Sequence, residues 1–243
     1  MRIIALLVLA VAASACVKDK SSIDEVVGSD NISGYVSLYD DGVGKVDDSG
    51  MTVTVEGVTP AVSAVTDAKG YFILPELRYG TYTLVYSKAG YGTYKRHNVD
   101  HTVELGGTFI TPTPSLGQLA KASVVSASAS VVGSEVKLSV STSPAGSMAN
   151  TVYLRFFLSK NKEVSSTTYM YHSANYISNM NPFVFTIQKS ELESFGYTAG
   201  TTMYFRVYAD AFWSNDYLNP ETGRMVFPNL NLTTPAPGSF VVP

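Results

Sequence analysis

Hydrophobic and polar residues alternate along much of the chain beyond residue 30, with the period of two that is typical of β-strands. The alternation is regular in 51–56 and 135–141, where every second residue is apolar. Because successive side chains of a strand point to opposite faces, each segment is expected to bury one face. The segment 152–158 is apolar on both faces apart from Arg155, which predicts a strand in the centre of a sheet.

Helical periodicity is almost absent from the sequence. The one segment able to form a helix is 189–195, which Gly196 would end after about two turns. Ser190 and Glu193 have the spacing of a capping box at its start. The remaining segments predict strands and turns, so the fold class is all-β.

The N-terminus has the pattern of a secretory signal. Arg2 precedes the apolar run 3–13, which is too short to span a bilayer, and small residues follow as far as Ala15. Cys16, the only cysteine of the chain, comes next. This order resembles the lipobox of bacterial lipoproteins, in which the cysteine is acylated and becomes the mature N-terminus, although Ala13 replaces the usual leucine. An ordinary secretory signal followed by a chance cysteine is the alternative.

The resemblance implies a signal peptide over 1–15, then the lipidated Cys16 and a polar tether over 16–29. Charged residues directly follow the cysteine, and this resembles the surface-export signal of Bacteroidetes lipoproteins. Two or three acyl chains suffice for stable anchoring. We therefore expect the membrane to be a partner through the lipid anchor, and the protein to lie in the outer membrane, facing the cell exterior.

Composition sets limits on the partners of the chain. Its 243 residues are 45% hydrophobic and 15% charged, which is typical of a folded globular protein. The formal net charge of -3 is too small to indicate nucleic acid as a partner. At about 100–200 residues per domain, the length predicts two domains. The predicted architecture is therefore two tandem antiparallel β-sandwich domains after a lipoprotein signal peptide.

The first predicted domain covers 30–115. A run of strand and turn motifs occurs there in order: Ser33-Gly34-Tyr35-Val36, then Val53-Thr54-Val55, Thr66-Asp67-Ala68-Lys69-Gly70-Tyr71-Phe72, Gly80-Thr81-Tyr82 and Lys88-Ala89-Gly90-Tyr91. This succession resembles the carboxypeptidase regulatory-like domain, a small transthyretin-like β-sandwich. In that family the module accompanies catalytic or transport domains and is not itself catalytic.

The second predicted domain covers 117–243 and follows a stiff segment with Pro112 and Pro114. The segment 200–209 is similar to the sixth strand of fibronectin type III and related immunoglobulin-like modules. The only tryptophan, Trp213, does not lie in an early strand, which departs from that pattern. Two long inserts, 159–182 and 211–226, also exceed typical hairpin loops.

The inserts carry the candidate ligand-binding residues, since binding groups concentrate on loops of a rigid sandwich. Aromatic side chains there alternate with amides and carboxylates, and a sugar needs flat faces for its rings and polar partners for its hydroxyls. The candidates are Tyr169, Tyr171, Tyr176, Phe212, Trp213, Asn215, Asp216 and Tyr217. The alternative is that these aromatic residues cap the sandwich or pack on the first domain.

Motifs for catalysis are missing from the sequence. It contains no Gly-x-Ser-x-Gly, no His-Glu-x-x-His and no phosphate-binding loop. Asp210, Asp216 and Glu221 would make a glycosidase pair only if the fold set two of them at the required separation. We therefore predict that the protein is not an enzyme and has no catalytic residues, no metal site and no cofactor.

The expected function is that of a non-catalytic, surface-exposed lipoprotein that binds a ligand, such as a glycan, as an accessory of a nutrient-uptake system. In this respect the chain resembles the accessory glycan-binding lipoproteins of Bacteroidetes. The alternative is a structural, adhesion or assembly subunit that binds another surface protein.

Overall fold

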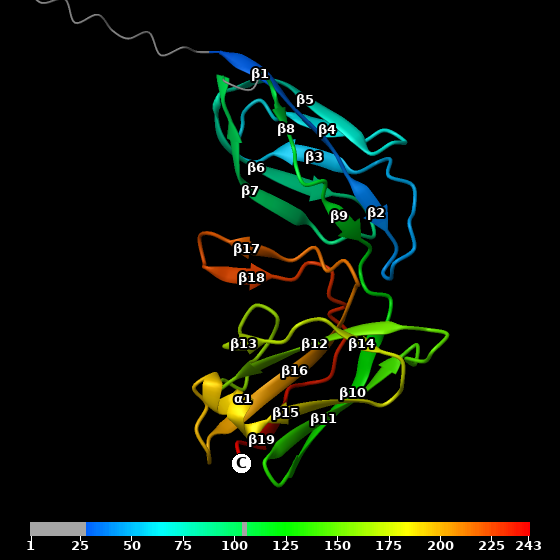
Figure 1. Cartoon of the computed structure of the whole chain (residues 1–243), viewed down its shortest axis with the longest axis vertical. Helices are drawn as coiled ribbons and strands as arrows, with labels where there is room; N and C mark the ends of the chain where they lie inside the picture. The colour runs from blue at the N-terminus through cyan, green and yellow to red at the C-terminus, as the bar shows by residue number, and fades with distance from the viewer. Residues whose placement is uncertain (1–27, 104–105) are drawn as a thin grey trace, which may run out of the picture.

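The computed structural model describes residues 28–103 and 106–243, and the regular secondary structure of this part consists of β-strands and one short helix. This confirms the all-β prediction. Two lobes are stacked along the longest axis of the molecule (Figure 1). The predicted signal peptide and Cys16 lie outside the described residues.

The first lobe is a small sandwich. Its strands are β1 (Ser29–Tyr35), β2 (Ser37–Tyr39), β3 (Thr52–Val55), β4 (Ser63–Val65), β5 (Tyr71–Arg78), β6 (Gly80–Ser87), β7 (Tyr94–His101), β8 (Thr108–Phe109) and β9 (Ser115–Gly117). One sheet has the order β5-β1-β8 and the other β4-β3-β6-β7, while β2 and β9 form a short parallel pair. The two sheets enclose a hydrophobic core that runs from Ile32 to Leu116.

The alternation seen in the sequence accounts for this core. Met51, Val53 and Val55 are buried, while Thr52 and Thr54 between them are partly exposed. Burying the three apolar side chains stabilises the sandwich by about 1.5–3 kcal/mol for each large aliphatic residue.

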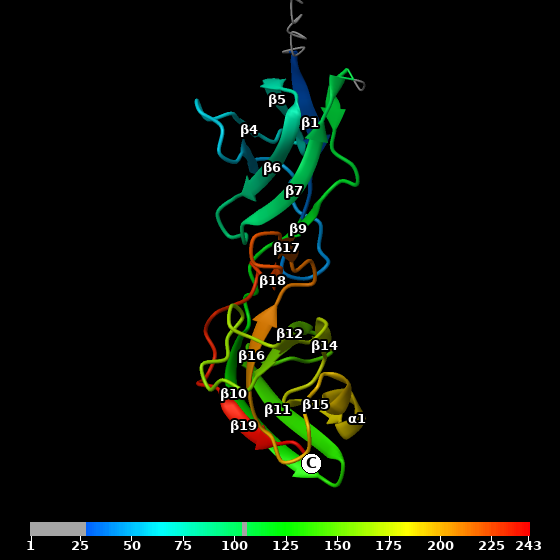
Figure 2. The same cartoon turned by 90° about the vertical axis from the view of Figure 1, so that its left-hand side faces the viewer.

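The second lobe is a larger sandwich. Its elements are β10 (Ser123–Val132), β11 (Glu135–Ser143), β12 (Val152–Ser159), β13 (Tyr171–His172), β14 (Tyr176–Ser178), β15 (Phe183–Gln188), α1 (Lys189–Ser194), β16 (Thr202–Asp210) and β19 (Gly238–Val241). One sheet has the order β10-β11-β15, and the other has the order β13-β12-β16-β19 with β14 also paired to β12. A separate hairpin of β17 (Tyr217–Asn219) and β18 (Arg224–Val226) lies between the two lobes in both views (Figures 1 and 2).

The strand β12 is central, as its sequence predicts, and every one of its residues is buried. Leu154, Phe156 and Leu158 face the sandwich core. On the opposite face Phe157 joins a second cluster with Tyr208 and Phe227. The loop that follows the hairpin therefore covers the outer face of this sheet.

The helix α1 is present, but its predicted cap is wrong. The N-cap is Gln188, whose backbone N–H donates to the Glu191 carboxylate over 2.7 Å. The strand β15 extends to Gln188, so the helix begins directly at the end of the sheet and the capping pair lies earlier than Ser190 and Glu193. Gly196 follows the helix with φ of 81°, a conformation that favours glycine.

Candidate binding site at the junction of the lobes

One buried asparagine connects the two lobes. Asn229 is 0% exposed, and its Oδ1 accepts a hydrogen bond from Gly92 N over 2.9 Å. Its Nδ2 donates to the backbone oxygens of Gly117 and Trp213 over 2.9 and 2.7 Å. The side chain thereby satisfies three buried backbone groups from distant segments, and such groups are costly to leave unpaired.

Two glycines allow the lobes to approach this closely. A Cβ on Gly92 would lie 2.3 Å from the carbonyl oxygen of Pro228, and one on Gly117 would lie 2.6 Å from that of Trp213. Both contacts are with backbone, which cannot move aside as a flexible side chain can. The junction therefore requires glycine at these positions.

Asn215 holds the loop that carries Trp213. It has φ of 55° and is buried, a conformation that asparagine adopts more readily than most residues. Its Oδ1 accepts from Gly117 N over 3.0 Å, and its Nδ2 donates to Gly117 O over 3.3 Å. Both ends of this amide are engaged within the chain, so its contribution to a site is to position the loop.

A row of aromatic rings crosses the junction. Trp213 packs on Tyr39 of the first lobe, with centroids 5.0 Å apart, and meets Phe212 at 5.1 Å with an interplanar angle of 84°. Phe212 in turn contacts Tyr153 of β12 at 5.6 Å. Phe212 remains 39% exposed, so one ring of this row is available to a ligand.

Tyr217 also packs across the junction. Its ring contacts Tyr94 of β7 at 6.0 Å and His97 at 5.7 Å. The hairpin of β17 and β18 is therefore in contact with the first lobe through this side chain.

A cavity of about 250 Å³ lies beside the loop, and we call it the junction pocket. Its walls come from both lobes and include Tyr94, Ser115, Leu116, Phe212, Trp213 and Asp216. Burial raises the pKa of Tyr94; Arg96 opposes the shift, and the charge of Asp216 adds to it. The Tyr94 hydroxyl is therefore a hydrogen-bond donor at neutral pH, next to a carboxylate.

A second, larger cavity of about 460 Å³ lies between the lobes, and we call it the lobe groove. It is lined by Asp40, Asp41, Lys121, Asn150, Thr151 and Tyr153, among others. Burial raises the pKa of Tyr153, and the charges of Asp40 and Asp41 add to this effect. Lys121 pairs with Asp41 over 2.8 Å.

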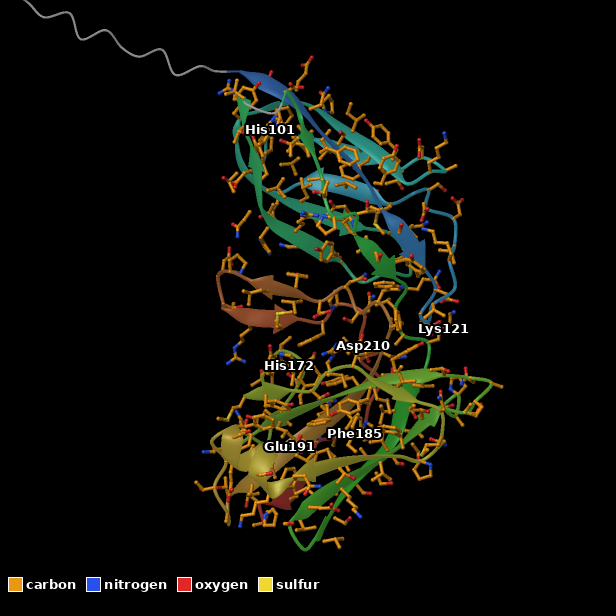
Figure 3. All side chains as sticks on the ribbon, in the orientation of Figure 1. His101, Lys121, His172, Phe185, Glu191 and Asp210 are labelled. Carbon is orange, nitrogen blue, oxygen red and sulfur yellow. The ribbon has the colours of Figure 1, made fainter. Side chains whose placement is uncertain are left out.

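Asp210 lies at the edge of the same groove but is not a free acid. Its carboxylate accepts from Arg155 Nε over 2.9 Å, and its side chain is 0% exposed (Figure 3 labels Asp210 and Lys121). Burial raises the pKa of Asp210, and Arg155 opposes that shift. Asp210 is therefore committed to an internal ion pair.

The three candidate tyrosines of the first insert lie elsewhere in the second lobe. Tyr169 donates its hydroxyl to Met225 O over 3.0 Å, and Tyr171 stacks on Phe195 at 4.0 Å. Tyr176 is 41% exposed and packs against Phe185. The structure therefore brings together Phe212, Trp213, Asn215 and Asp216 at the junction pocket, but not the three tyrosines.

Sequence reasoning missed Tyr39, Tyr94 and Tyr153. They come from β2, β7 and β12, and no spacing along the chain connects them. Tyr153 also belongs to a strand whose pattern indicates only a buried core.

Within residues 28–103 and 106–243, no three His, Cys, Asp or Glu side chains are grouped so that they could hold a metal ion. In the same part of the chain no helix has the length and apolar character needed to cross a membrane.

The fold and the junction define a two-lobed all-β protein with a small pocket to which both lobes contribute. Residues 32–109, about a third of the chain, match the carboxypeptidase regulatory-like domain family. This confirms the family resemblance predicted for the first domain. No curated protein matches the chain.

Several solved structures are similar to parts or most of the chain. A mutant type II cohesin–X-dockerin complex from Acetivibrio cellulolyticus is 27% identical over 37% of this chain and 59% of its own, with a TM-score of 0.31. A second mutant of that complex is covered over 56% of its length, so the chain spans less than two thirds of both.

Two other solved structures are similar over a greater length. A DUF3823 family protein from Parabacteroides merdae is 12% identical over 88% of this chain and 99% of its own, with a TM-score of 0.33. A Bacteroides uniformis protein provisionally described as carbohydrate-binding is 12% identical over 87% and 98%, also with a TM-score of 0.33. These TM-scores are too low to transfer a ligand or partner to this chain.

Proposed function

We propose that the protein is a non-catalytic, lipid-anchored surface protein that binds a glycan in the junction pocket, as an accessory of a nutrient-uptake system. The observation that carries this proposal is the corner formed by Phe212 and Trp213 beside Tyr94 and Asp216. Two rings meet there at 84°, which leaves an aromatic face next to hydrogen-bonding groups.

The chemistry of this corner is that of a sugar site. An aromatic ring provides an apolar face for the C–H groups of a pyranose, and a few placed polar groups fix its orientation. The Tyr94 hydroxyl is a donor, and the Asp216 carboxylate, which accepts from Ser214 Oγ through one oxygen, is an acceptor. At about 250 Å³ the pocket is slightly smaller than the usual range of small-molecule sites, about 300–1,000 Å³. It therefore fits one sugar unit.

The second lobe supports the proposed division of the chain into domains 30–115 and 117–243. Separate hydrophobic clusters fill the two lobes, one from Ile32 to Leu116 and one from Ala120 to Val242. In the second lobe, the sheet β10-β11-β15 faces a sheet that contains β12, β16 and β19. This order is compatible with a fibronectin type III or immunoglobulin-like sandwich, which we propose for this lobe.

The proposed anchor is acylated Cys16, in the outer membrane of a Bacteroidetes-like cell and facing outward. The described part of the chain begins with β1 at the end of the first lobe that is remote from the second lobe (Figure 1). An anchor before β1 would therefore leave the junction pocket away from the membrane, which suits a surface ligand.

The test is affinity electrophoresis in gels that contain neutral polysaccharides, with Phe212→Ala and Asp216→Asn beside the wild type. We expect at least one polysaccharide to retard the wild type and both variants to migrate faster than it. Phe109→Ala is the matched control, because Phe109 is 51% exposed on β8, outside the residues that line the pocket. If no polysaccharide retards the wild type, glycan binding is refuted.

A second candidate function, assembly with another surface protein, is favoured by β10. This strand is ten residues long, lies at the end of its sheet and carries no charged side chain. Long uncharged edges are templates for added strands, because their backbone groups on one side are unpaired. Val131→Lys on this exposed edge should abolish capture of a stoichiometric partner from native membranes, and capture that persists in this variant would exclude β10 as the interface.

A further inference from the structure

Phe212 lines the junction pocket and contacts two residues that line the lobe groove. Its backbone N–H donates to Asp41 O over 2.9 Å. Asp41 is itself part of the lobe groove. The Phe212 ring contacts the ring of Tyr153, and Tyr153 also lines the lobe groove. The exposed Phe212 ring therefore lies next to residues of both cavities.

Both cavities provide the same pair of hydrogen-bonding groups. The junction pocket has the Tyr94 hydroxyl and Asp216, and the lobe groove has the Tyr153 hydroxyl and Asp40. Asp40 Oδ1 accepts from the backbone of Gly42 and Gly44 over 2.8 and 2.9 Å. Among the described residues, Asp40 Oδ2 and the Tyr153 hydroxyl have no hydrogen-bond partner. Each cavity thus offers a free donor and a free acceptor, which is what a sugar ring with adjacent hydroxyls requires.

The charges around the two cavities select against an acidic ligand. Asp41 is compensated by Lys121 and Asp210 by Arg155. Asp40 and Asp216 form no ion pair among the described residues, although the charge of Lys121 also acts on Asp40. An anionic sugar would bring a further negative charge close to these two carboxylates, and like charges repel.

We propose that the ligand is a neutral oligosaccharide of at least two sugar units that lies across Phe212, with one unit in the junction pocket and the next in the lobe groove. This inference rests on the proposed glycan-binding function and specifies its ligand. Each cavity is lined by residues of both lobes. The ligand therefore contacts the first lobe through Asp40 and Tyr94 and the second lobe through Tyr153.

The test is isothermal titration calorimetry on the full mature chain with matched sugar series. The probes are glucose, xylose, mannose and galactose, their β-linked oligomers of two to six units, and polygalacturonate as an anionic polymer. We expect affinity in one neutral series to rise at least about tenfold from one unit to three, equal to about 1.4 kcal/mol, and then level off. Polygalacturonate should bind more weakly than that series.

A variant separates the two cavities. Tyr153→Phe removes only the hydroxyl in the lobe groove and keeps the ring, so we expect weaker binding of the oligomer and a smaller gain in affinity from one unit to three. Tyr35→Phe is the matched control, because Tyr35 is 38% exposed in β1 and lines neither cavity. Equal affinity for one unit and three, or wild-type oligomer binding by Tyr153→Phe, overturns the two-cavity ligand while leaving the junction pocket intact. Binding of polygalacturonate above the neutral series overturns the neutral class, and the absence of any sugar binding refutes the proposed function itself.

Discussion

Replacing Asn229 by alanine should separate the two lobes without unfolding either. The side chain is 0% exposed and bonds to Gly92 N, Gly117 O and Trp213 O. Alanine removes these three hydrogen bonds and a fourth, which Asn229 Oδ1 accepts from Asn215 Nδ2 over 3.3 Å. The hydrophobic cores of the two lobes do not include Asn229 and should persist.

The magnitude follows from the partners that lose their only hydrogen bond at the junction. Gly117 O keeps a bond from Asn215 Nδ2 at 3.3 Å, so Gly92 N and Trp213 O are the two groups left unpaired. At about 1–3 kcal/mol for each buried unpaired group, the junction should lose about 2–6 kcal/mol. With a urea dependence of about 2 kcal/mol per M, even the lower value shifts the transition of the junction by about 1 M.

Trp213 reports this transition directly, because it is the only tryptophan and its ring packs on Tyr39 across the junction. We expect the fluorescence of Asn229→Ala to shift to longer wavelength at lower urea than that of the wild type, while far-UV circular dichroism retains its β signal. Asn179→Ala is the control, since this exposed residue only accepts from Thr151 Oγ1. Coincident fluorescence transitions of Asn229→Ala and wild type would refute the reasoning that Asn229 holds the lobes together.

Three further predictions concern the ion pair, a glycine and the anchor. Arg155→Met should lower the free energy of unfolding by about 3–5 kcal/mol, because it leaves the Asp210 carboxylate buried without its partner. Urea denaturation measures this, and a loss below about 1 kcal/mol contradicts it. Gly117→Ala should destabilise the junction by about 1–3 kcal/mol, because its Cβ would lie 2.6 Å from Trp213 O. The urea transition of Trp213 fluorescence measures this loss. Gly42→Ala is the control: its Cβ would lie 3.4 Å from the nearest atom, so its stability should stay within about 0.5 kcal/mol of the wild type. Equal destabilisation by Gly117→Ala and Gly42→Ala would argue against the close contact of Gly117 with Trp213. Cys16→Ser should move the protein from the membrane pellet to the soluble fraction, and a variant that still sediments with membranes is evidence against the lipid anchor.

Local pattern predicted much of the fold. The alternation around Val53 and Val55 and the apolar run of β12, which only Arg155 interrupts before Ser159, indicated one half-buried and one central strand, and both lie as expected. Such signals are readable because the side chains of a strand alternate between faces whatever the partner strand is. The cap of α1 was not readable, because it depends on where β15 leaves the sheet.

The candidate site was predictable only in part. The segment from Phe212 to Tyr217 was singled out as a ligand-binding candidate, since aromatic and polar residues are concentrated in it, and Phe212, Trp213, Asn215 and Asp216 line the junction pocket. The structure shows that Trp213 and Tyr217 pack on the first lobe, one of the alternatives that the sequence left open. Only Phe212 keeps a substantially exposed ring among these three.

The sequence by itself determined that this protein is all-β and that 32–109 resemble a carboxypeptidase regulatory-like domain, because both depend on short-range pattern and motif order. The tertiary structure alone decided that Tyr94, Tyr153 and Asp216 meet around Phe212. These residues come from different strands and loops, and their proximity is set by how two sandwiches approach each other through Gly92, Gly117 and Asn229. No periodicity along the chain encodes a contact between residues that lie so far apart in the sequence.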